Sequence, residues 1–460
     1  MSGQEAVVHE ATQETVAARR GILDRIPMLA PLGGRDFRLV WAGESVSLFG
    51  DQFHIVALAA LVLAMTGSGL ALGAILLAAS IPRGLFLLLG GALSDRVRPR
   101  DLALISNVVR AIVTTLIAAL VLGGRVELWY LAAAGVVFGT VDAVFLPAIN
   151  TLIPRLVPVD RLAAANAVMA GTAQLMGTVG PAVAGFAVAL VGPGAAFALD
   201  AASFAVAAGA LWLVRGGAVA TLVDAAEPPA TAVDVVPDPR LESSALEAPA
   251  VAPGVPDARR TSMLGSIVAG SRAVLGEPIM RSIVILSTAA NLAFTGPSVV
   301  GLPWLVLVHF GAGPIALGLV FAAFGAGSLV GVVAAGSLQR PQRLGHVVLA
   351  LVLAMGFGLA AAGVAPSVPV LAVVSAVTGA ISGYVNVVVI AWAQARSDPA
   401  MLGRTMSFLM LGGVVAAPLS LVIASAVVDT HATELFLLAG ALVIGAGLYG
   451  FASGVAKRMT

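Results

Sequence analysis

Three ionisable side chains, Glu44, Asp51 and His54, lie within one long apolar segment, residues 37–65. As an α-helix this segment is longer than the roughly 20 residues that cross the hydrocarbon core of a bilayer. A charge at that depth costs roughly 2.5–3.5 kcal/mol or more unless it faces a cavity or a partner. Glu44 and Asp51 are about two full turns apart, so their carboxylates share one helix face, and His54 lies within about 60° of it. The pattern predicts a helix that lines a polar path across a membrane.

Two further charges, Arg83 and Asp142, lie in later apolar segments. Counted from the predicted cytoplasmic ends of their helices, Asp51, Arg83 and Asp142 are all roughly 18–21 Å deep at about 1.5 Å per residue. Buried charges persist when they are paired, so we expect Arg83 to face Asp51 or Asp142. A low-dielectric site favours the protonated carboxyl, and a nearby arginine favours the carboxylate. The candidates for proton coupling are therefore Asp51, Glu44, Asp142, His54 and Arg83.

Each candidate also has a structural alternative. Asp51 could form a purely structural ion pair, and Glu44 could hydrogen-bond the backbone of an inner gate. His54 could be a hydrogen-bonding lining residue, although imidazole titrates near neutral pH. Asp142 is open between a functional and a structural role. Asp200 is expected to be a helix-end or packing partner, because a carboxylate suits a helix N-terminus.

The composition places most of the chain in a lipid bilayer. Hydrophobic residues make up 59% and charged residues 11%, against about 25% charged residues in soluble proteins, and the mean hydropathy is +1.02. The formal net charge of +1 gives no reason to expect a nucleic-acid partner. The chain has no cysteine, and its five histidines are too dispersed for a metal site. No Gly-rich phosphate loop with a lysine is present, so we expect no enzyme activity, no metal and no cofactor, only a proton gradient.

Twelve apolar segments predict an all-α membrane protein with twelve transmembrane helices in two six-helix halves. The segments are residues 37–65, 70–93, 102–122, 128–153, 162–191 and 195–214, then 279–308, 314–338, 344–364, 368–393, 401–428 and 433–456. Arginines gather in the loops of one side, which the positive-inside rule assigns to the cytoplasm together with both termini. The predicted parts are a cytoplasmic tail (1–36), an N-terminal half (37–215), a cytoplasmic linker (216–277), a C-terminal half (278–456) and a short tail (457–460). The linker is rich in proline and acidic residues and is predicted to be partly disordered.

The loop after the second segment reads GALSDRVRPR, residues 91–100. It resembles the signature loop of the major facilitator superfamily, G-x-L-x-D-R-x-G-R-R/K, although Arg98 and Pro99 replace the turn glycine and its neighbour. The resemblance implies the major facilitator fold, two six-helix halves that rock about a central site. It also implies a gating latch, formed by Gly91, Asp95, Arg96, Arg100 and Arg110.

Other stretches are similar to the enterobactin-exporter and macrolide-efflux branch of proton-coupled exporters. They are FRLVWAG at 37–43, PA at 147–148, LAAANA at 162–167 and GRTMS at 403–407. The stretch GTVGPAVAG at 177–185 is similar to the G-P-x-x-G-G core of exporters, with Ala184 in place of the first closing glycine. The resemblance implies exporter-type helix packing at Gly180, Pro181 and Gly185, and the alternative is ordinary close packing of small residues.

The second half is nearly free of charge: residues 282–339 and 347–395 contain no Asp, Glu, Lys or Arg. Its candidate cavity-lining side chains are Asn291, Tyr384 and Asn386. We therefore expect a monomeric secondary active transporter in the bacterial cytoplasmic (inner) membrane, whose partners are lipid, protons and a small-molecule substrate. It would export a small amphipathic compound, such as a drug, siderophore or secondary metabolite, by proton antiport with alternating access. The alternatives are proton-coupled uptake of a small metabolite and a non-transporting membrane sensor.

Overall fold

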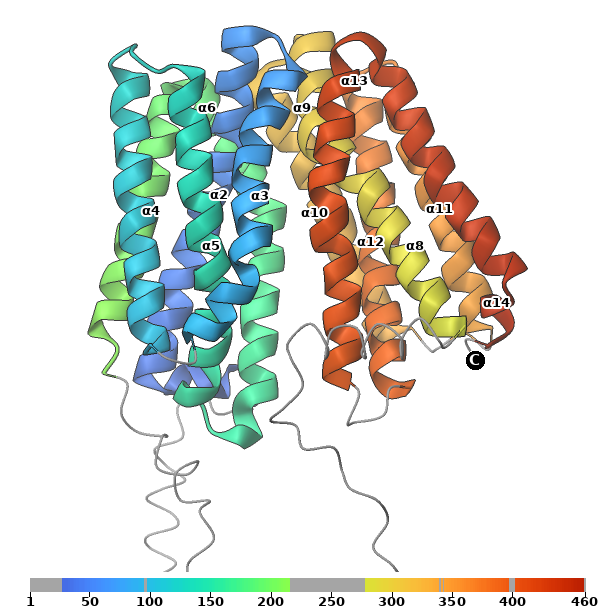
Figure 1. The fold of residues 1–460 in the computed structure, drawn as a ribbon, viewed down its shortest axis with the longest axis horizontal. Coiled ribbons are helices and arrows are strands. Elements are labelled where there is room, and N and C mark those ends of the chain that lie inside the picture. Colours follow the sequence, from blue (N-terminus) through green and yellow to red (C-terminus); the bar gives the residue numbers. More distant parts are fainter. Residues whose placement is uncertain are drawn as a thin grey trace, which may run out of the picture.

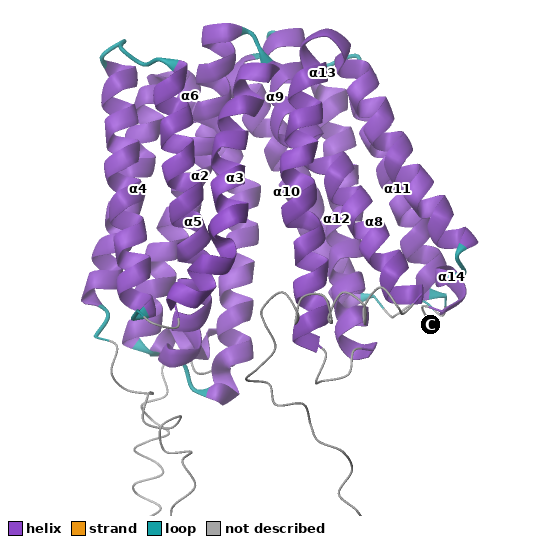
Figure 2. Cartoon of the chain, viewed as in Figure 1, coloured by secondary structure: helices purple, strands orange, loops and turns teal. Residues whose placement is uncertain are grey.

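The structure is a computed structural model that describes residues 27–94, 97–215, 278–338, 341, 343–396 and 402–458. Within these ranges every regular element is a helix and there is no strand (Figure 2). The predicted all-α class is therefore confirmed for the described chain. The expected linker, 216–277, lies outside the described residues, as do Asp95 and Arg96, and the predicted domain boundaries stay predictions.

Ten helices of the described chain are long and apolar enough to cross a membrane. The N-terminal half contains η2 (Pro27–Gly33), α2 (Arg35–Thr66), α3 (Gly69–Ser94), α4 (Pro99–Leu122), α5 (Leu128–Leu156), η3 (Val159–Arg161) and α6 (Leu162–Leu213). The C-terminal half contains α8 (Pro278–Gly296), η6 (Pro297–Gly301), α9 (Leu302–Trp304), η7 (Leu305–His309), α10 (Gly313–Ser337), α11 (Leu344–Gly363), α12 (Val368–Arg396), α13 (Leu402–Ala452) and α14 (Val455–Arg458).

Two of these helices are double. In α6 the backbone leaves the helical region at Gly192 (φ 80°, ψ 168°), a conformation that glycine adopts without a Cβ clash. In α13 it does so at His431 (φ −137°, ψ 49°), and Figure 1 shows α13 turning back there. Each of the four resulting arms has at least about 20 residues, enough for one span. The arrangement is compatible with the twelve predicted spans; that number and the cytoplasmic termini stay predictions.

The helices form two bundles that pair their members in the same way. In the N-terminal half α2 packs along α6, α3 along α5 and α4 along the second arm of α6. In the C-terminal half α8 packs along the first arm of α13, α10 along α12 and α11 along the second arm of α13. The halves lie side by side, touch at the upper end in Figure 1 and diverge toward the lower end.

Two helix pairs join the halves: α3 with the first arm of α13, and the first arm of α6 with α10. Small residues permit this contact, because a Cβ at Gly73 would clash with Ser425 and one at Gly185 would lie 2.5 Å from the carbonyl oxygen of Pro314. One buried cluster draws from both halves, including Phe53 of α2 and Leu317 of α10. The halves therefore share a core only near the end where they meet.

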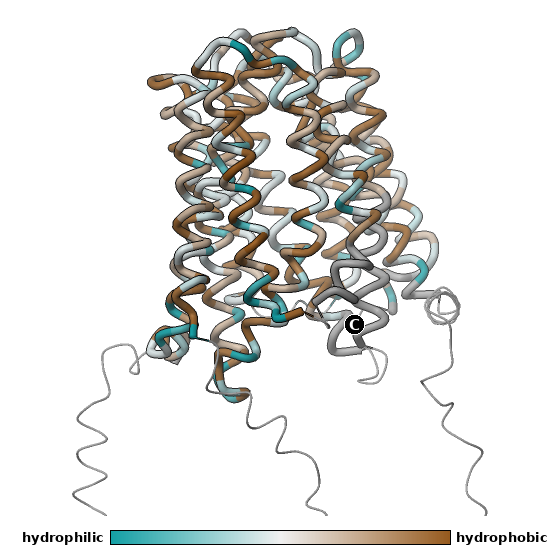
Figure 3. The backbone as a smooth tube through the Cα atoms, turned by 60° about the vertical axis from the view of Figure 1, so that its left-hand side comes forward, coloured by the Kyte–Doolittle hydropathy of each residue, from teal (hydrophilic) through white to brown (hydrophobic). Residues whose placement is uncertain are grey.

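The outer faces of the bundles are apolar. Leu85, Leu190, Trp212 and Leu438 are each 67–68% exposed, and Figure 3 shows hydrophobic residues along the full length of the helices. Continuous apolar surface of this extent is foreign to soluble monomers. Lipid is the solvent that suits these faces.

Candidate functional site

The ionisable side chains expected at membrane depth do gather in the N-terminal half. Asp51 lies near the middle of α2 and interacts electrostatically with Asp200, Arg110, Glu44 and Asp142. Both Asp51 and Glu44 are half-buried, and neither has a hydrogen bond or ion pair to another described residue. They are carboxyl groups inside the bundle that no neighbour holds in place.

Asp142 of α5 is the anchor of two arginines. Its Oδ1 accepts a hydrogen bond from Nη2 of Arg110, and its Oδ2 lies 3.7 Å from Nη1 of Arg83. Arg110 is buried, and its guanidinium lies over the Phe145 ring at 4.2 Å. Of the two partners expected for Arg83, the structure places Asp142 beside it. Asp51 is not its partner.

The position of Arg110 corrects one expectation. The family resemblance placed Arg110 with Asp95 in a gating latch, and the structure pairs it with Asp142 instead. The reason is depth, because Arg110 lies about three turns into α4, inside the bundle and away from the loop. Asp95 itself lies outside the described residues.

A second polar pair joins α2 to α6. Nδ1 of His54 lies 3.0 Å from Oδ2 of Asp200, whose side chain is fully buried. The imidazole packs against Phe138 and Phe197, with ring centroids 5.0 and 5.3 Å away. Asp200 was expected to be a helix-end or packing partner; it lies inside the second arm of α6, away from its end, and its side chain pairs with His54. The only signal in the sequence was a lone carboxyl in an apolar segment.

The cluster has more acids than bases. Four carboxyl groups, from Glu44, Asp51, Asp142 and Asp200, face two guanidiniums and one imidazole. An uncompensated carboxylate in a low-dielectric surrounding is costly, and a bound proton removes that cost. Asp51 and Glu44 are the groups whose protonation breaks no existing ion pair. The arrangement can therefore bind and release protons without dismantling the bundle.

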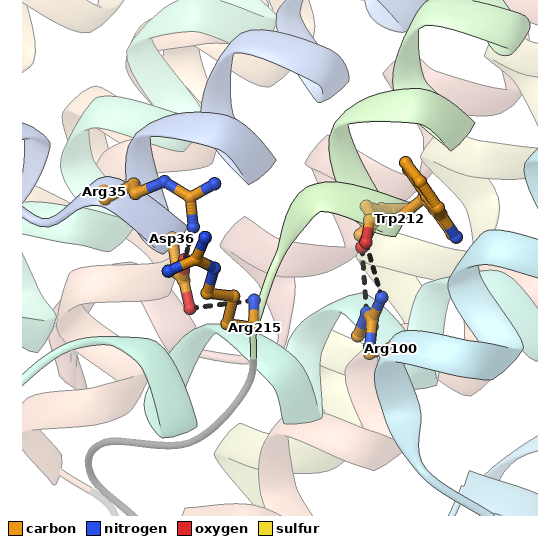
Figure 4. A network of polar contacts seen from close by, with 6 residues as sticks. Arg35, Asp36, Arg100, Trp212 and Arg215 are labelled. Atoms are coloured by element: carbon orange, nitrogen blue, oxygen red, sulfur yellow. Dashed lines mark hydrogen bonds and ion pairs between the residues drawn. The ribbon is translucent and has the colours of Figure 1, made fainter.

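The residues expected in the gating latch are dispersed. Gly91 lies near the end of α3, and Asp95 and Arg96 are outside the described residues. Arg100 donates hydrogen bonds to the carbonyl oxygens of Leu211 (2.9 Å) and Trp212 (2.6 Å) at the end of α6 (Figure 4). Carbonyls at a helix C-terminus lack intrahelical partners, so Arg100 caps α6. The latch stays a prediction for Gly91, Asp95 and Arg96.

The same end of the bundle is fastened a second time. Asp36, in the first turn of α2, accepts a hydrogen bond from the backbone N–H of Arg215 at 3.2 Å and lies 3.4 Å from Nη1 of Arg35 (Figure 4). These contacts connect α2 to the residues that follow α6. They are structural ties at the end opposite to the contact between the halves.

The glycine–proline stretch of α6 lies where three helices converge. A Cβ at Gly180 would clash with the Gln52 side chain of α2, and one at Gly185 would press on Pro314 and Gly318 of α10. A Cβ at Gly318 would in turn clash with the carbonyl oxygen of Pro181. The three residues expected to give exporter-type packing thus form the contact of α6 with α2 and with the other half.

The cavity-lining candidates of the C-terminal half stay apart from the charges. Asn291 donates to the Ser287 carbonyl of its own helix at 2.8 Å. Tyr384 is half-buried and Asn386 is exposed, both on α12. No described hydrogen bond or ion pair links these three side chains to the N-terminal cluster, and their lining role stays a prediction.

Two hollows lie away from the acids. A cavity of about 20 Å³ in the C-terminal half is lined mainly by apolar side chains, among them Phe294, Phe324 and Phe436. A groove of about 400 Å³ between α2 and α6 is lined by Ser45, Val46, Phe49, Leu175, Met176 and Val179. At 100° per residue its α2 positions lie on the face roughly opposite Glu44 and Asp51. Among the described residues no group of three or more potential ligands could hold a metal ion.

One residue at the contact between the halves was not identified from the sequence. Asp429 of α13 accepts hydrogen bonds from the Gly69 N–H at 2.6 Å, the Ser68 hydroxyl at 2.6 Å and the Leu70 N–H at 3.4 Å. A carboxylate from one half therefore caps the N-terminus of α3 in the other, where the helix dipole favours negative charge. The partners are about 360 residues apart, so no local pattern predicts the contact.

The comparisons with known proteins agree with a membrane transporter. A family profile described as a transmembrane secretion effector matches residues 26–232. The chain is 28% identical over 410 residues to the uncharacterized MFS-type transporter y4rN of Sinorhizobium fredii (strain NBRC 101917 / NGR234), with 88% of this chain and 91% of the relative covered. It is 24% identical over 407 residues to the multidrug efflux pump Tap of Mycolicibacterium fortuitum, with 86% and 90% covered.

The fold agrees as well. A crystal structure of a mutant of the nucleoside transporter NupG superposes with a TM-score of 0.65 at 12% identity, over 91% of this chain and 99% of that one. The protein is a multi-pass membrane transporter. Its N-terminal half matches a family profile of membrane transporters, and nearly its whole length is similar to major facilitator transporters, which agrees with the resemblance of the signature loop.

Proposed function

We propose that this transporter exports a small amphipathic compound across the bacterial cytoplasmic membrane in exchange for protons. The observation that carries the proposal is the pair of unpaired, half-buried carboxyls, Glu44 and Asp51, in a cluster with more acids than bases. The similarity to Tap, whose name describes multidrug efflux, supports the direction and the class of cargo. The cargo is a drug, a siderophore or a secondary metabolite made by the cell.

Protons are coupled through the competition between a proton and the cargo for the same carboxylate. When the site opens to the more acidic outer side, Asp51 takes up a proton, loses its charge and releases a cargo held by that charge. When the site opens to the cytoplasm, the proton leaves and the carboxylate can bind new cargo. Each cycle moves a proton inward and a cargo molecule outward. The Arg110–Asp142 pair stays ionised through the cycle and keeps Asp51 within reach of a positive charge.

The packing of the two halves supports alternating access. The halves meet through α3 with α13 and through α6 with α10, and they diverge at the other end (Figure 1). With the predicted topology the closed end faces outward, and the site opens toward the cytoplasm, where an exporter loads its cargo. Rocking about the central contacts then exposes the site to the outside.

The C-terminal half suits an amphipathic cargo. Its membrane segments offer apolar and aromatic side chains and a few hydroxyl and amide groups, which is the composition of a small-molecule site. A partly charged compound can place its polar group on the N-terminal acids and its apolar body on the other half.

The direction and the coupling are tested together in inside-out membrane vesicles. With ethidium as the probe, vesicles that contain the protein and have an acidic interior should accumulate the dye, and an uncoupler should release it. Vesicles without the protein are the control, and a panel of dyes, macrolides and siderophore precursors extends the screen. Dye loss from acid-interior vesicles would indicate uptake by symport, and dye movement indifferent to the gradient would exclude proton coupling.

A further inference from the structure

A row of buried polar side chains on α4 contains unpaired atoms that have no part in the cycle described so far. Asn107, Arg110 and Thr114 are three and four residues apart, so they lie on one face of the helix. Their exposures are 0%, 6% and 0%. Both amide atoms of Asn107, Nε of Arg110 and Oγ1 of Thr114 are buried and have no hydrogen-bond partner within the described protein. A buried polar atom left unpaired costs roughly 1–3 kcal/mol, so four such atoms on one face require a partner.

The facing helix supplies a fifth unpaired atom at the same level. The second arm of α6 runs antiparallel to α4: Arg100 binds the carbonyls of Leu211 and Trp212, and Arg110 lies 5.6 Å from the Phe204 ring. Thr114 is one turn beyond Arg110, and Asp200 is one turn beyond Phe204 in the matching direction. Thr114 and Asp200 therefore lie at the same depth on facing helices, and Oδ1 of Asp200 is also buried without a partner.

The same interface in the other half shows that the fold does not need these groups. There α11 packs on the second arm of α13 through Gly356 and Gly440, which lie back to back. The buried side chains beside them, Met355, Leu359 and Val443, are all apolar. On α4 the unpaired buried atoms form a row, whereas on the described part of α11 there is a single one, Nδ1 of His346 beside Phe451.

Water fits the unpaired atoms better than a metal ion does. Buried waters typically make about three hydrogen bonds to otherwise unsatisfied polar groups. The row offers both donors and acceptors, and Nε of Arg110 is a donor that water can satisfy and a metal ion cannot. The oxygen ligands that a cation needs are confined to Asp200, Thr114 and one amide. The row therefore has the chemistry of a short chain of water molecules.

We propose that this row holds a hydrated proton path that runs inside the N-terminal half, from Asn107 past the Arg110–Asp142 pair and Thr114 to the His54–Asp200 pair. A carboxylate only accepts hydrogen bonds, so Nδ1 of His54 carries a hydrogen toward Asp200 and Nε2 is the free acceptor. A hydronium in the path gives its proton to Nε2, which leaves water and an imidazolium beside Asp200. The reverse step returns the proton. The path rests on the proposed proton coupling and adds a route separate from the cargo.

The charges around His54 suit this role. Asp200 from α6, Asp51 from its own helix and Asp142 from α5 all act electrostatically on it. Each stabilises an imidazolium when it is ionised. Arg110 of α4 is held by Asp142, which reduces its repulsion. A proton on His54 is therefore compensated from three sides.

The test separates proton movement from cargo movement. In proteoliposomes, Thr114→Val and Asn107→Leu should slow gradient-driven ethidium transport about tenfold, the effect of losing one water-bridged hydrogen bond, while ethidium counterflow at equal pH stays at the wild-type rate. Thr115→Val is the matched control, because the Thr115 hydroxyl is exposed and bonds the Ala111 carbonyl of its own helix. Unchanged gradient-driven transport in both variants, or equal loss of transport and counterflow, would overturn the path.

A second measurement does not depend on transport. An experimental map of the wild-type protein in nanodiscs, at a resolution that shows water, should contain ordered water between Thr114 and Asp200. A dry, closed contact there would overturn the path even if export is proton-coupled. Water in this place together with gradient-independent dye movement would instead keep the hydrated row and reject the proposed exporter.

Discussion

The N-terminal half pairs α2 with α6 and α3 with α5, and the C-terminal half repeats this with α8 on α13 and α10 on α12. The first half places four acids and two arginines inside the membrane, while residues 282–339 and 347–395 of the second contain none. Because the second half builds the same bundle without them, the charges are not needed for the architecture. Burying these charges costs stability. The difference between the halves indicates that the first half binds protons and the second half contacts the apolar part of the cargo.

The comparison predicts that the N-terminal half alone depends on a buried ion pair. Asp142→Asn leaves the buried Arg110 without its carboxylate, which should cost about 3–5 kcal/mol and lower the thermal unfolding temperature in detergent. Arg83→Gln is the matched control and should cost much less, because Arg83 is 50% exposed and 3.7 Å from Asp142. Equal stability of the two variants would remove Asp142 as the anchor of the cluster.

The contact between the halves should be intolerant of bulk. Gly185→Leu forces a side chain against Pro314 and Gly318, so the closed end should open and transport should fall at least tenfold. Spin labels at Leu70→Cys and Thr430→Cys measure the gap, since the chain has no native cysteine. Gly171→Leu on the same arm of α6 meets nothing within 4 Å and should leave the gap unchanged. A wild-type distance in Gly185→Leu would contradict the role of the α6–α10 contact in holding the closed end together.

Asp429 should have a smaller effect on the same gap. Asp429→Asn keeps the size of the side chain and removes the charge that caps α3, which is worth about 1 kcal/mol at an exposed position. We expect a several-fold larger fraction of molecules in which the spin labels at positions 70 and 430 are far apart, and faster cargo exchange. An unaltered distance distribution would show that the cap does not hold the closed end.

Arg100 is expected to have the smallest effect. Arg100→Gln removes two hydrogen bonds to the end of α6, which should lower stability by about 1 kcal/mol and leave gradient-driven dye transport unchanged. A transport defect without loss of stability would return Arg100 to the gating latch that the signature loop implied.

The sequence predicts the helices well because the hydropathy of a segment and the turns at its ends depend on residues that are close together in the chain. The segments 162–191 and 195–214 and the segments 401–428 and 433–456 are separate in the sequence, and the chain breaks between them at Gly192 and His431. Asp51, Arg83 and Asp142 can likewise be identified as candidate site residues from the sequence, because a charge in an apolar segment is costly to bury.

The partners of those charges are not local, and the sequence fails there. His54 and Asp200 are 146 residues apart, and no pattern in either segment predicts that α2 and α6 bring them together. Arg110 was assigned to a loop partner because the family motif lies near it, whereas helix packing presents it to Asp142. The cap by Asp429 depends on how two separate halves meet, which no single segment encodes.

The most direct test is the number of protons moved per dye molecule by wild type and by Asp51→Asn in the same proteoliposomes. The variant is nearly isosteric and breaks no described ion pair, so it should fold and insert normally. It should lose the proton flux that accompanies dye movement and, because the same carboxylate holds the cargo, bind ethidium more weakly, while Asn291→Leu in the other half should weaken dye binding and keep the proton count. A wild-type proton count in Asp51→Asn would contradict the assignment of proton coupling to this half.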